Sequence, residues 1–223
     1  MYYDLCVNYD PSLINLNNFQ NLSELITSGI CDGFKIFAIN TLRSGIITNN
    51  ESIKDINIDI EKAFNAYSLK FLNSSSDSLS MLNFKDIKLL RRITFEISDT
   101  KEIYQITNLM PSLKAYDIVA IIPKNEKIFE LACNNDLNVD LITINFDEKI
   151  NFFLKKSLIL SALDNNIFFE ILYNGFITDN SKRAVFISNI LMLLEITKGK
   201  NLIISSGSEN YIDHRSPYDI INL

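Results

Sequence analysis

Short apolar runs rich in β-branched residues alternate with helix-like stretches along most of this chain. Such an alternation is typical of a parallel sheet built from βα units. Several of the runs are almost continuously apolar, as expected for strands that are covered on both faces. Seven strands are predicted: Tyr2–Val7, Phe34–Ile39, Lys88–Ile97, Asp117–Ile122, Asp140–Ile144, Ile167–Leu172 and Asn201–Ile204. Seven or eight units of this kind close most naturally into a barrel.

Amphipathic helices are predicted between the strands, because apolar residues recur there at i, i+3 and i+4. Three examples lie within residues 22–30, 128–132 and 187–194. A further helix start is predicted near the end of the chain. Ser216 stands where an N-cap belongs, and Pro217 occupies the first helical position, where its missing N–H costs nothing.

One segment interrupts the alternation, since no clear strand is visible from Arg43 to Glu51. A helical stripe follows, and it ends in the polar tract 73–78, which is typical of a flexible loop. The stripe consists of Ile56, Ile60, Phe64, Tyr67 and Phe71. We therefore predict one domain over residues 1–223 with a variable insertion at about 41–83.

The composition indicates a globular intracellular protein. Of 223 residues 47% are hydrophobic and 22% charged, no apolar run approaches the ~18 residues that cross a bilayer, and the start lacks a secretory signal. No membrane contact is expected. Cys6, Cys31 and Cys133 are widely spaced without a CxxC pair, which favours buried thiols. A net charge of −6 argues against nucleic-acid binding by bulk charge alone.

Residues for catalysis are sparse. A metal-dependent hydrolase on a barrel needs several His, Asp and Glu ligands at the carboxyl ends of strands, yet His214 is the single histidine. Asp4, Asp140 and Asp164 could hold only a weakly bound hard cation, so cap, turn or surface roles are favoured for them. His214 is interpreted as a polar loop residue rather than a ligand or general base.

Nucleotide cofactors are disfavoured as well, because the chain has neither a Walker A sequence nor a glycine-rich dinucleotide fingerprint. Residues 205–208 could present backbone N–H groups to a phosphate, but a plain loop is the favoured interpretation. Basic residues remain as the strongest candidates. Lys124, Lys127 and Arg215 follow predicted strands, and on a barrel such loops gather on one rim.

Several stretches resemble the TIM-barrel-like protein subunit shared by nuclear ribonuclease P and ribonuclease MRP. They are LLRRITFEISD at 89–99, YDIVAIIPKNEKIFELAC at 116–133, GKNLIISS at 199–206 and RSPYDIINL at 215–223. The opening YYDLCV and FKIFAIN at 34–40 fit the first two strands of the same family. The resemblance covers nearly the whole chain in order, and residues 41–83 match poorly.

The resemblance implies a TIM-barrel-like fold related to phosphoesterases of the polymerase-and-histidinol-phosphatase (PHP) type, without their catalytic ligands. It implies a non-catalytic subunit of a ribonucleoprotein that removes the 5′ leader from precursor tRNA, with MRP acting on ribosomal RNA. The RNA component would carry the catalytic Mg²⁺, so no cofactor or metal is expected on this chain. The implied partners are that RNA, a small α/β protein subunit and other subunits of the particle, in the nucleus and its nucleolus.

The resemblance also suggests RNA-binding positions. Arg92 matches a basic residue of the third-strand motif, Lys124 and Lys127 match the PKxEK-like turn, and Arg183 matches an arginine of the helix before the last strand. The other two positions are Lys200 of the GKN motif and Arg215 before the PYD motif. These six are expected to contact phosphates, which position a protein on RNA without reading bases. No catalytic residue is assigned.

Two alternatives stay open from the residues alone. One is a free-standing metal-dependent phosphoesterase on the same barrel, and the other is a protein-interaction scaffold. Members of the resembled family usually continue beyond the point that corresponds to Leu223. We therefore expect either that this lineage has a shorter final helix or that the sequence is incomplete.

Overall fold

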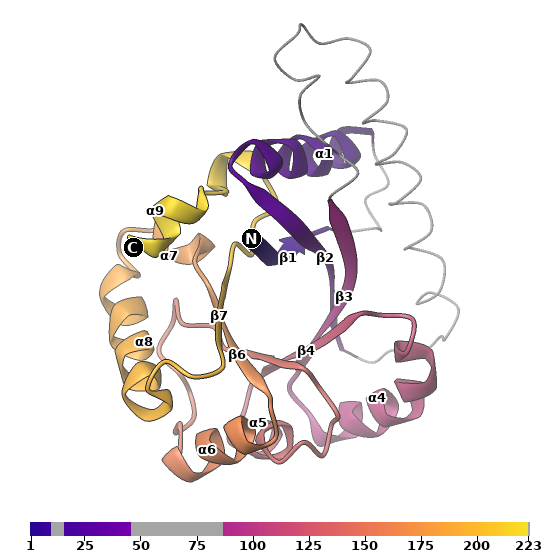
Figure 1. The fold of residues 1–223 in the computed structure, drawn as a ribbon. Coiled ribbons are helices and arrows are strands. Elements are labelled where there is room, and N and C mark those ends of the chain that lie inside the picture. The colour runs from indigo at the N-terminus through magenta and orange to yellow at the C-terminus, as the bar shows by residue number, and fades with distance from the viewer. Residues whose placement is uncertain (10–15, 46–86, 223) are drawn as a thin grey trace, which may run out of the picture.

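A parallel sheet rolled into a barrel forms the centre of the computed structural model, which describes residues 1–9, 16–45 and 87–222 (Figure 1). Each strand pairs in parallel with the next along the chain, in the order β1 to β7. The strands are β1 (Tyr2–Asn8), β2 (Phe34–Ser44), β3 (Lys88–Ile97), β4 (Ile118–Pro123), β5 (Leu141–Thr143), β6 (Phe168–Leu172) and β7 (Leu202–Ser205). The seven predicted strands are confirmed, most within one residue at each end.

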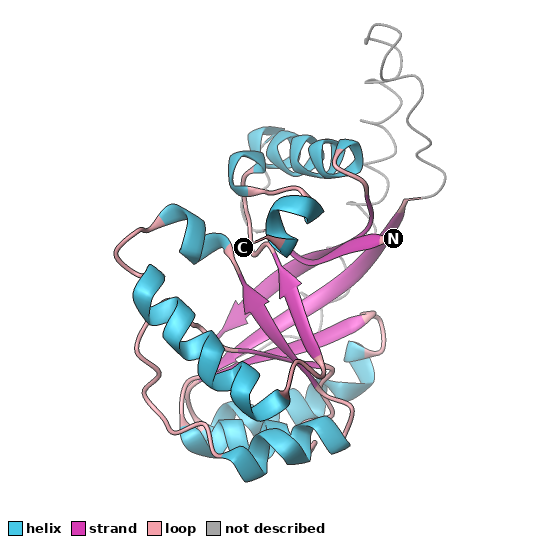
Figure 2. Cartoon of the chain, turned by 60° about the vertical axis from the view of Figure 1, so that its left-hand side comes forward, coloured by secondary structure: helices cyan, strands magenta, loops and turns pink. Residues whose placement is uncertain are grey.

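Helices surround the barrel on its outside, as Figure 1 shows along the axis and Figure 2 from the side. Two of these helices begin at polar N-cap residues. Asp99 forms a capping box with Glu102 at the start of α4, and the side chain of Asn125 accepts a hydrogen bond from Ile128 N at the start of α5. The helices are α1 (Leu16–Cys31), α4 (Thr100–Leu113), α5 (Glu126–Cys133), α6 (Lys156–Asp164), α7 (Asn174–Thr178), α8 (Arg183–Thr197), the 3₁₀ helix η2 (Tyr211–Asp213) and α9 (Pro217–Ile221). Ser216 caps α9, as predicted.

The barrel is closed by the segment that follows β7. Gly207 N donates to Cys6 O at 2.9 Å, and Asn8 N donates to Ser208 O at 2.9 Å. Ser206 and Ser208 are fully buried. The interpretation of residues 205–208 as a plain loop is therefore wrong, because these residues supply the backbone pairing that joins the last strand to the first.

The apolar core lies between the strands and the helices. Outward residues of β3, namely Ile93, Phe95 and Ile97, pack with apolar residues of α4, α5, α6 and α8 in the larger cluster. A smaller cluster joins α1 to β1 and β2 around Phe37. Because the outward positions hold the apolar residues, the inward positions of the strands are left to polar side chains.

The predicted insertion starts later than expected. Residues 41–44 continue β2 as a paired strand, and Ser44 lies opposite Glu96 of β3. A strand was missed here because Asn40, Thr41 and Arg43 interrupt the apolar run. The remainder of the insertion, with its helical stripe, lies outside the described residues.

Two of the three cysteines are buried as predicted. Cys6 and Cys133 are buried, and burial raises the pKa of the Cys133 thiol to about 12, so it stays neutral. Cys31 is exposed at the end of α1, which corrects the prediction for that residue. Within the described residues, no helix has the length and apolar character needed to cross a bilayer.

We predict that Gly29→Ala destabilises the protein, although alanine favours helices by about 1 kcal/mol. A Cβ on Gly29 of α1 would lie 2.7 Å from Phe37 Cε1 and 3.2 Å from His214 Cε1. Since Phe37 is fully buried, overpacking should cost about 1–3 kcal/mol. Urea unfolding measures the change. Ser28→Ala on the same helix is the control and should shift stability by at most about 0.5 kcal/mol; equal or higher stability of the Gly29 variant would contradict the packing.

Candidate functional site

A buried ion pair occupies the inside of the barrel. Arg92 of β3 meets Glu170 of β6 in a two-pronged contact, with Nη1 to Oε1 at 2.5 Å and Nη2 to Oε2 at 2.6 Å. Neither side chain is exposed to solvent. Paired N–H donors from one guanidinium to one carboxylate form the strongest common geometry for such a contact.

The remaining hydrogen-bonding groups of this pair are also satisfied. Arg92 Nη1 donates to Leu5 O at 2.6 Å, and its Nε donates to Thr94 Oγ1 at 3.1 Å. Thr143 Oγ1 and Ser205 Oγ each donate to Glu170 at 2.7 Å. Because these partners come from different strands, the ion pair links opposite sides of the barrel wall.

The expected phosphate contact of Arg92 is contradicted by this arrangement. Its guanidinium is fully buried and bonded to Glu170, so no phosphate reaches it. Arg91 beside it is exposed and lies 3.5 Å from Asp117 Oδ2. Neighbouring residues of a strand point to opposite sides of the sheet, so only one of the two arginines, Arg91 or Arg92, could face outward.

A second buried contact holds the C-terminal segment. His214 Nε2 lies 3.3 Å from Asp4 Oδ2, without the alignment of a hydrogen bond, and both side chains are buried. Asp4 Oδ1 accepts from the N–H groups of Cys6 and Ser206. Burial alone would raise the pKa of Asp4, but the contacts with His214 and Ser206 outweigh it and lower that pKa. His214 therefore lies in a loop, as predicted, but it is a buried structural residue of that loop.

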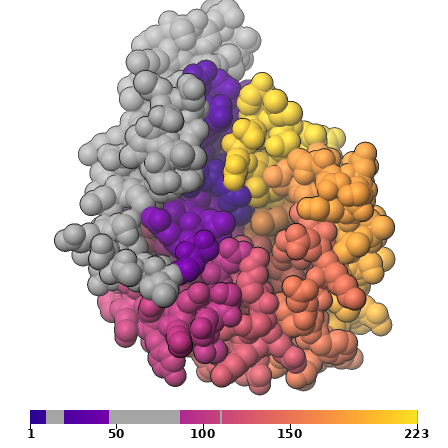
Figure 3. Space-filling view, turned by 180° about the vertical axis from the view of Figure 1, so that it is seen from behind, coloured from indigo at the N-terminus to yellow at the C-terminus, as the bar shows by residue number. Residues whose placement is uncertain are grey.

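The position of Arg215 follows from the path of the C-terminal segment after β7. The ring of His214 packs on Phe34, the first residue of β2, at 4.9 Å, and Tyr218 packs on Tyr2 at 5.9 Å. The chain after β7 thus turns back along the outside of the barrel toward the amino ends of the strands. Figure 3 shows this yellow segment against the indigo N-terminal part. Arg215 is therefore not on one rim with Lys124 and Lys127, contrary to the prediction.

A polar cavity of about 310 Å³ opens at the carboxyl ends of β4, β5 and β6. Lys124 lines it and forms an ion pair with Glu96 at 2.5 Å, both partly exposed. Asp147 and Asn174 line it as well, and burial raises the pKa of Asp147. The cavity thus carries both signs of charge, so Lys124 can meet an anion here only in competition with Glu96.

The other three predicted RNA contacts are exposed but scattered. Lys127 lies in the first turn of α5, which begins beyond the carboxyl end of β4. Arg183 begins α8, donates to Phe176 O at 2.9 Å and stacks on the Phe176 ring. Lys200 precedes β7 and so lies at the opposite end of the barrel. Three of the six predicted RNA contacts lie at the carboxyl end of the barrel, where the cavity opens: Lys124, Lys127 and Arg183.

Comparison with known proteins identifies the family of this chain. The model of the family described as "RNase P subunit p30" matches residues 1–223, the whole chain. The chain belongs to this family. It is 39% identical over 139 residues to the mouse ribonuclease P protein subunit p30, covering 62% of this chain and 52% of that protein. The Saccharomyces cerevisiae ribonuclease P/MRP protein subunit RPP1 is 28% identical over 137 residues, covering 61% and 45%. The chain spans about half the length of these relatives.

Solved structures share the fold. A chain of archaeal ribonuclease P with mature tRNA superposes with a TM-score of 0.60 at 16% identity, covering 98% of this chain and 79% of that one. Histidinol phosphate phosphatase from Lactococcus lactis, solved with zinc, L-histidinol and phosphate, superposes with a TM-score of 0.56 at 12% identity, covering 99% and 92%. The predicted barrel of the TIM and PHP type is confirmed.

The interior of this p30-family barrel also holds polar residues that were not predicted to matter from the sequence. Glu170 and Thr143 were missed, as was Asn40, whose Oδ1 accepts from Thr94 Oγ1 at 2.6 Å. Ser205 was considered only for its backbone, whereas its side chain donates to Glu170. A signal was present, because Glu170 interrupts the apolar run FFEIL. Among the described residues, no group of three His, Cys, Asp or Glu side chains could hold a metal ion. Asp140 instead accepts from Val119 N, and Asp164 ends α6.

We predict that Arg92→Met and Glu170→Leu each destabilise the protein by about 3–5 kcal/mol, because each leaves one buried charge without its partner. The double variant should regain much of this loss, since it buries no charge. Denaturant unfolding followed by circular dichroism measures all three. Arg91→Met is the control at an exposed ion pair and should cost at most about 1 kcal/mol. Strictly additive losses in the double variant would contradict a coupled pair.

We predict that Asp4→Asn reduces the loss of stability in acid. Since the folded pKa of Asp4 is lowered, its carboxylate stabilises the fold above its unfolded pKa of about 3.9. That contribution is lost as pH falls through the folded pKa. Urea midpoints from about pH 6 down to about pH 3 should therefore fall more steeply for the wild type than for the variant. The exposed Asp136→Asn is the control; identical slopes for wild type and Asp4→Asn would refute the prediction.

Proposed function

We propose that this chain is a non-catalytic protein subunit of the ribonucleoprotein ribonuclease P, and also of ribonuclease MRP. In this role it supports removal of the 5′ leader from precursor tRNA and the processing of ribosomal RNA. The observation that carries the proposal is the match of the whole chain to the p30 family. The yeast relative is a ribonuclease P/MRP subunit by name, which supports the second particle.

The barrel interior supports a role without catalysis. Arg92, Glu170, Thr143 and Thr94 lie inside the barrel, where they bond to one another. Groups that are mutually satisfied and buried cannot approach a substrate. In this proposal the catalytic Mg²⁺ sits on the RNA component, and the chain carries no cofactor.

RNA contact is proposed at the end of the barrel with the polar cavity, through Lys124, Lys127 and Arg183. Lys200 and Arg215 lie on other faces and would meet other parts of the RNA. Because the net charge is −6, these few cations cannot hold the RNA by bulk attraction, so protein subunits would share the contact. A small α/β subunit and further subunits are the proposed partners, in the nucleus and nucleolus.

Native isolation of the tagged protein from its own cells, followed by sequencing of the bound RNA, tests the proposal. A single large RNA and cleavage of precursor tRNA by the particle are expected. Metal-dependent release of phosphate from p-nitrophenyl phosphate by the isolated chain would instead favour the phosphoesterase alternative. Recovery of neither RNA nor activity would favour the protein-interaction scaffold.

We predict that replacing Lys124, Lys127 and Arg183 together by Gln weakens binding to that RNA and flattens its dependence on salt. Loss of up to three phosphate contacts should reduce the slope of log K against log salt by about 2. Filter binding at several salt concentrations measures it. The control replaces Lys35, Lys88 and Lys114, which are exposed at the opposite end of the barrel, so that the charge change is equal. An equal effect of both triple variants would contradict a specific contact.

A further inference from the structure

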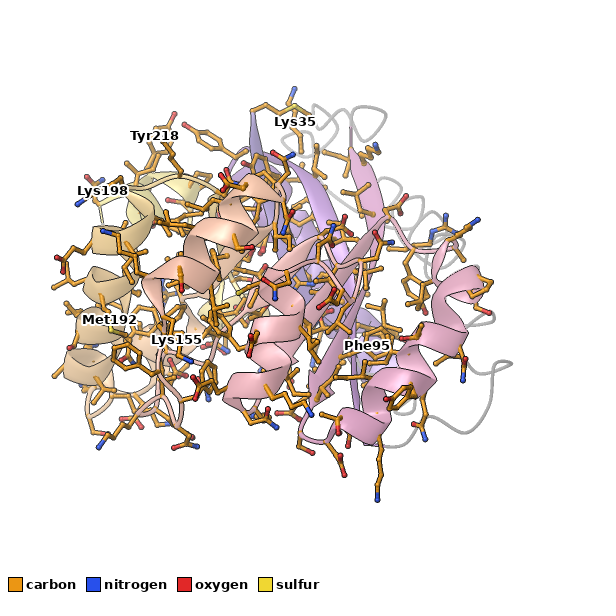
Figure 4. The ribbon with its side chains drawn as sticks, turned by 90° about the horizontal axis from the view of Figure 1, so that it is seen from below. Lys35, Phe95, Lys155, Met192, Lys198 and Tyr218 are labelled. Atoms are coloured by element: carbon orange, nitrogen blue, oxygen red, sulfur yellow. The ribbon has the colours of Figure 1, made fainter. Side chains whose placement is uncertain are left out.

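The polar cavity of about 310 Å³ at the carboxyl end of the barrel has the volume of a small-ligand site, which begins at about 300 Å³. In Figure 4 the carboxyl ends of the strands lie on the side of Phe95, away from Lys35, which marks the amino ends. Apolar side chains of Ile122, Ile144 and Leu172 line part of the cavity. Polar groups line the rest, so the cavity combines apolar walls with hydrogen-bonding groups.

Asp147 contributes a carboxylate that is not paired with a cation. The ion pairs of the described residues do not include it. It approaches the backbone closely at Gly175, where a Cβ would collide with the carboxylate. Burial raises the pKa of this carboxyl, Lys182 lowers it, and Glu148 and Asp179 raise it. A partly buried, unpaired carboxylate is stabilised by a ligand that brings N–H donors.

Two donors line the same cavity. Asn145 Oδ1 accepts from Asp147 N at 3.2 Å, which leaves the Nδ2 group of Asn145 as a donor. Lys124 is the second donor, although Glu96 holds it in an ion pair. The lining therefore presents a carboxylate acceptor together with amide and ammonium donors.

The charges around the cavity disfavour an ionic ligand. The following groups line the cavity, line the narrow hollow next to it or shift the pKa of Asp147: the acids Glu96, Asp147, Glu148 and Asp179 and the lysines Lys124, Lys149 and Lys182. Since the acids outnumber the lysines, a phosphate is disfavoured inside the cavity. A guanidinium or ammonium group is disfavoured as well, because it offers no acceptor to Asn145 Nδ2 and is repelled by Lys124. A neutral ligand with both donors and acceptors matches the lining.

We propose that the cavity binds the base of one unpaired guanosine of RNA, with Asp147 accepting from N1–H and N2–H and Asn145 Nδ2 donating to O6. Guanine presents two adjacent N–H donors and a neighbouring acceptor on this edge. Adenine and cytosine present one amino donor beside a ring-nitrogen acceptor, and uracil presents one N–H between two carbonyls. Unstacked bases of single-stranded RNA are read on this edge.

The phosphates on either side of the base stay outside the cavity in this arrangement, at the end of the barrel where Lys127 is exposed. The inference rests on the proposed function for taking the base from RNA. The pattern of donors and acceptors in the cavity is independent of that function.

Titration of the isotope-labelled full chain with guanosine 5′-monophosphate, followed by NMR, tests the proposal. Saturable shifts of the amide signals of Asn145, Asp147 and Gly175 are expected. The affinity should exceed that for the adenosine, cytidine and uridine monophosphates by about tenfold or more, as a bidentate contact discriminates between bases. Equal affinity for the four nucleotides, no saturable shift, or tighter binding of L-arginine amide overturns the proposal.

Two variants separate base recognition from bulk charge. Asp147→Asn and Glu148→Gln each remove one negative charge, and charge alone would make both bind the anionic nucleotide more tightly. We expect Asp147→Asn to lower the affinity for the guanosine nucleotide by about tenfold, because the carboxylate is lost. Glu148 is exposed and does not line the main cavity, so Glu148→Gln should not lower the affinity. Unchanged or tighter binding by Asp147→Asn overturns the proposal.

Gly175→Ala is a further variant, and it keeps the carboxylate. Its Cβ would displace the side chain of Asp147 from the position that it occupies against Gly175. The same loss of affinity for the guanosine nucleotide is therefore expected, and binding equal to that of the wild type overturns the assigned role of Asp147. Thermal unfolding checks that all three variants fold.

Photo-crosslinking in the native particle identifies the occupant of the cavity. A diazirine amino acid replaces Thr178, an exposed residue of the cavity lining. Tyr104 of α4, which is 74% exposed, receives the same group as a control. A crosslink from position 178, but not from position 104, to a guanosine of the RNA is expected. A crosslink from position 178 to another protein subunit or to a different base overturns the proposal.

The two proposals fail in distinguishable ways. RNA sequencing of the isolated particle reports on ribonuclease P, whereas nucleotide titration of the chain alone reports on the base site. If the chain selects the guanosine nucleotide but the particle holds no ribonuclease P RNA, the guanine site stands and the proposed function fails. If that RNA is present and the chain does not distinguish the nucleotides, the base-site inference fails alone.

Discussion

The ion pair between Arg92 and Glu170 is the interaction on which the rest of the barrel depends. Its hydrogen bonds, continued through Thr94, Asn40 and Asn8, reach every strand except β4 among the bonds of the described residues. Two charges buried in the interior require close pairing and complete hydrogen bonding, because either charge alone would cost several kcal/mol. The network therefore sets the mutual positions of strands that are far apart in the sequence, while the apolar core lies outside the strands.

A barrel whose interior is closed in this way must act through its outer surfaces. The carboxyl end of the barrel holds the polar cavity and the cations Lys124 and Arg183. The C-terminal segment packs against β1 through the contact of His214 with Asp4. Helix α8 borders an apolar groove on the outside of the barrel. These surfaces face different directions. The proposed subunit would meet both RNA and protein, which requires several separate contact surfaces, and this arrangement offers them on one barrel.

Much of the fold could be predicted because local signals agree with it. Near-continuous apolar runs marked the seven parallel strands, and Ser216 with Pro217 marked the start of α9. The candidate site was harder. Arg91 and Arg92 are indistinguishable in an apolar run, and their roles differ only through which side of the strand each one faces. The stripe on α8 was equally ambiguous, because apolar periodicity does not tell whether the protein itself covers that face.

By itself the sequence determined the succession of strands and helices, the parallel barrel and the family, since each depends on local periodicity and on residues in a fixed order. Only the tertiary structure decided that Arg92 is sealed inside, that Arg215 turns away from Lys124, and that His214 meets Asp4. These outcomes depend on contacts between residues separated by up to most of the chain length. Such contacts arise from how the barrel closes, which no short stretch of sequence specifies.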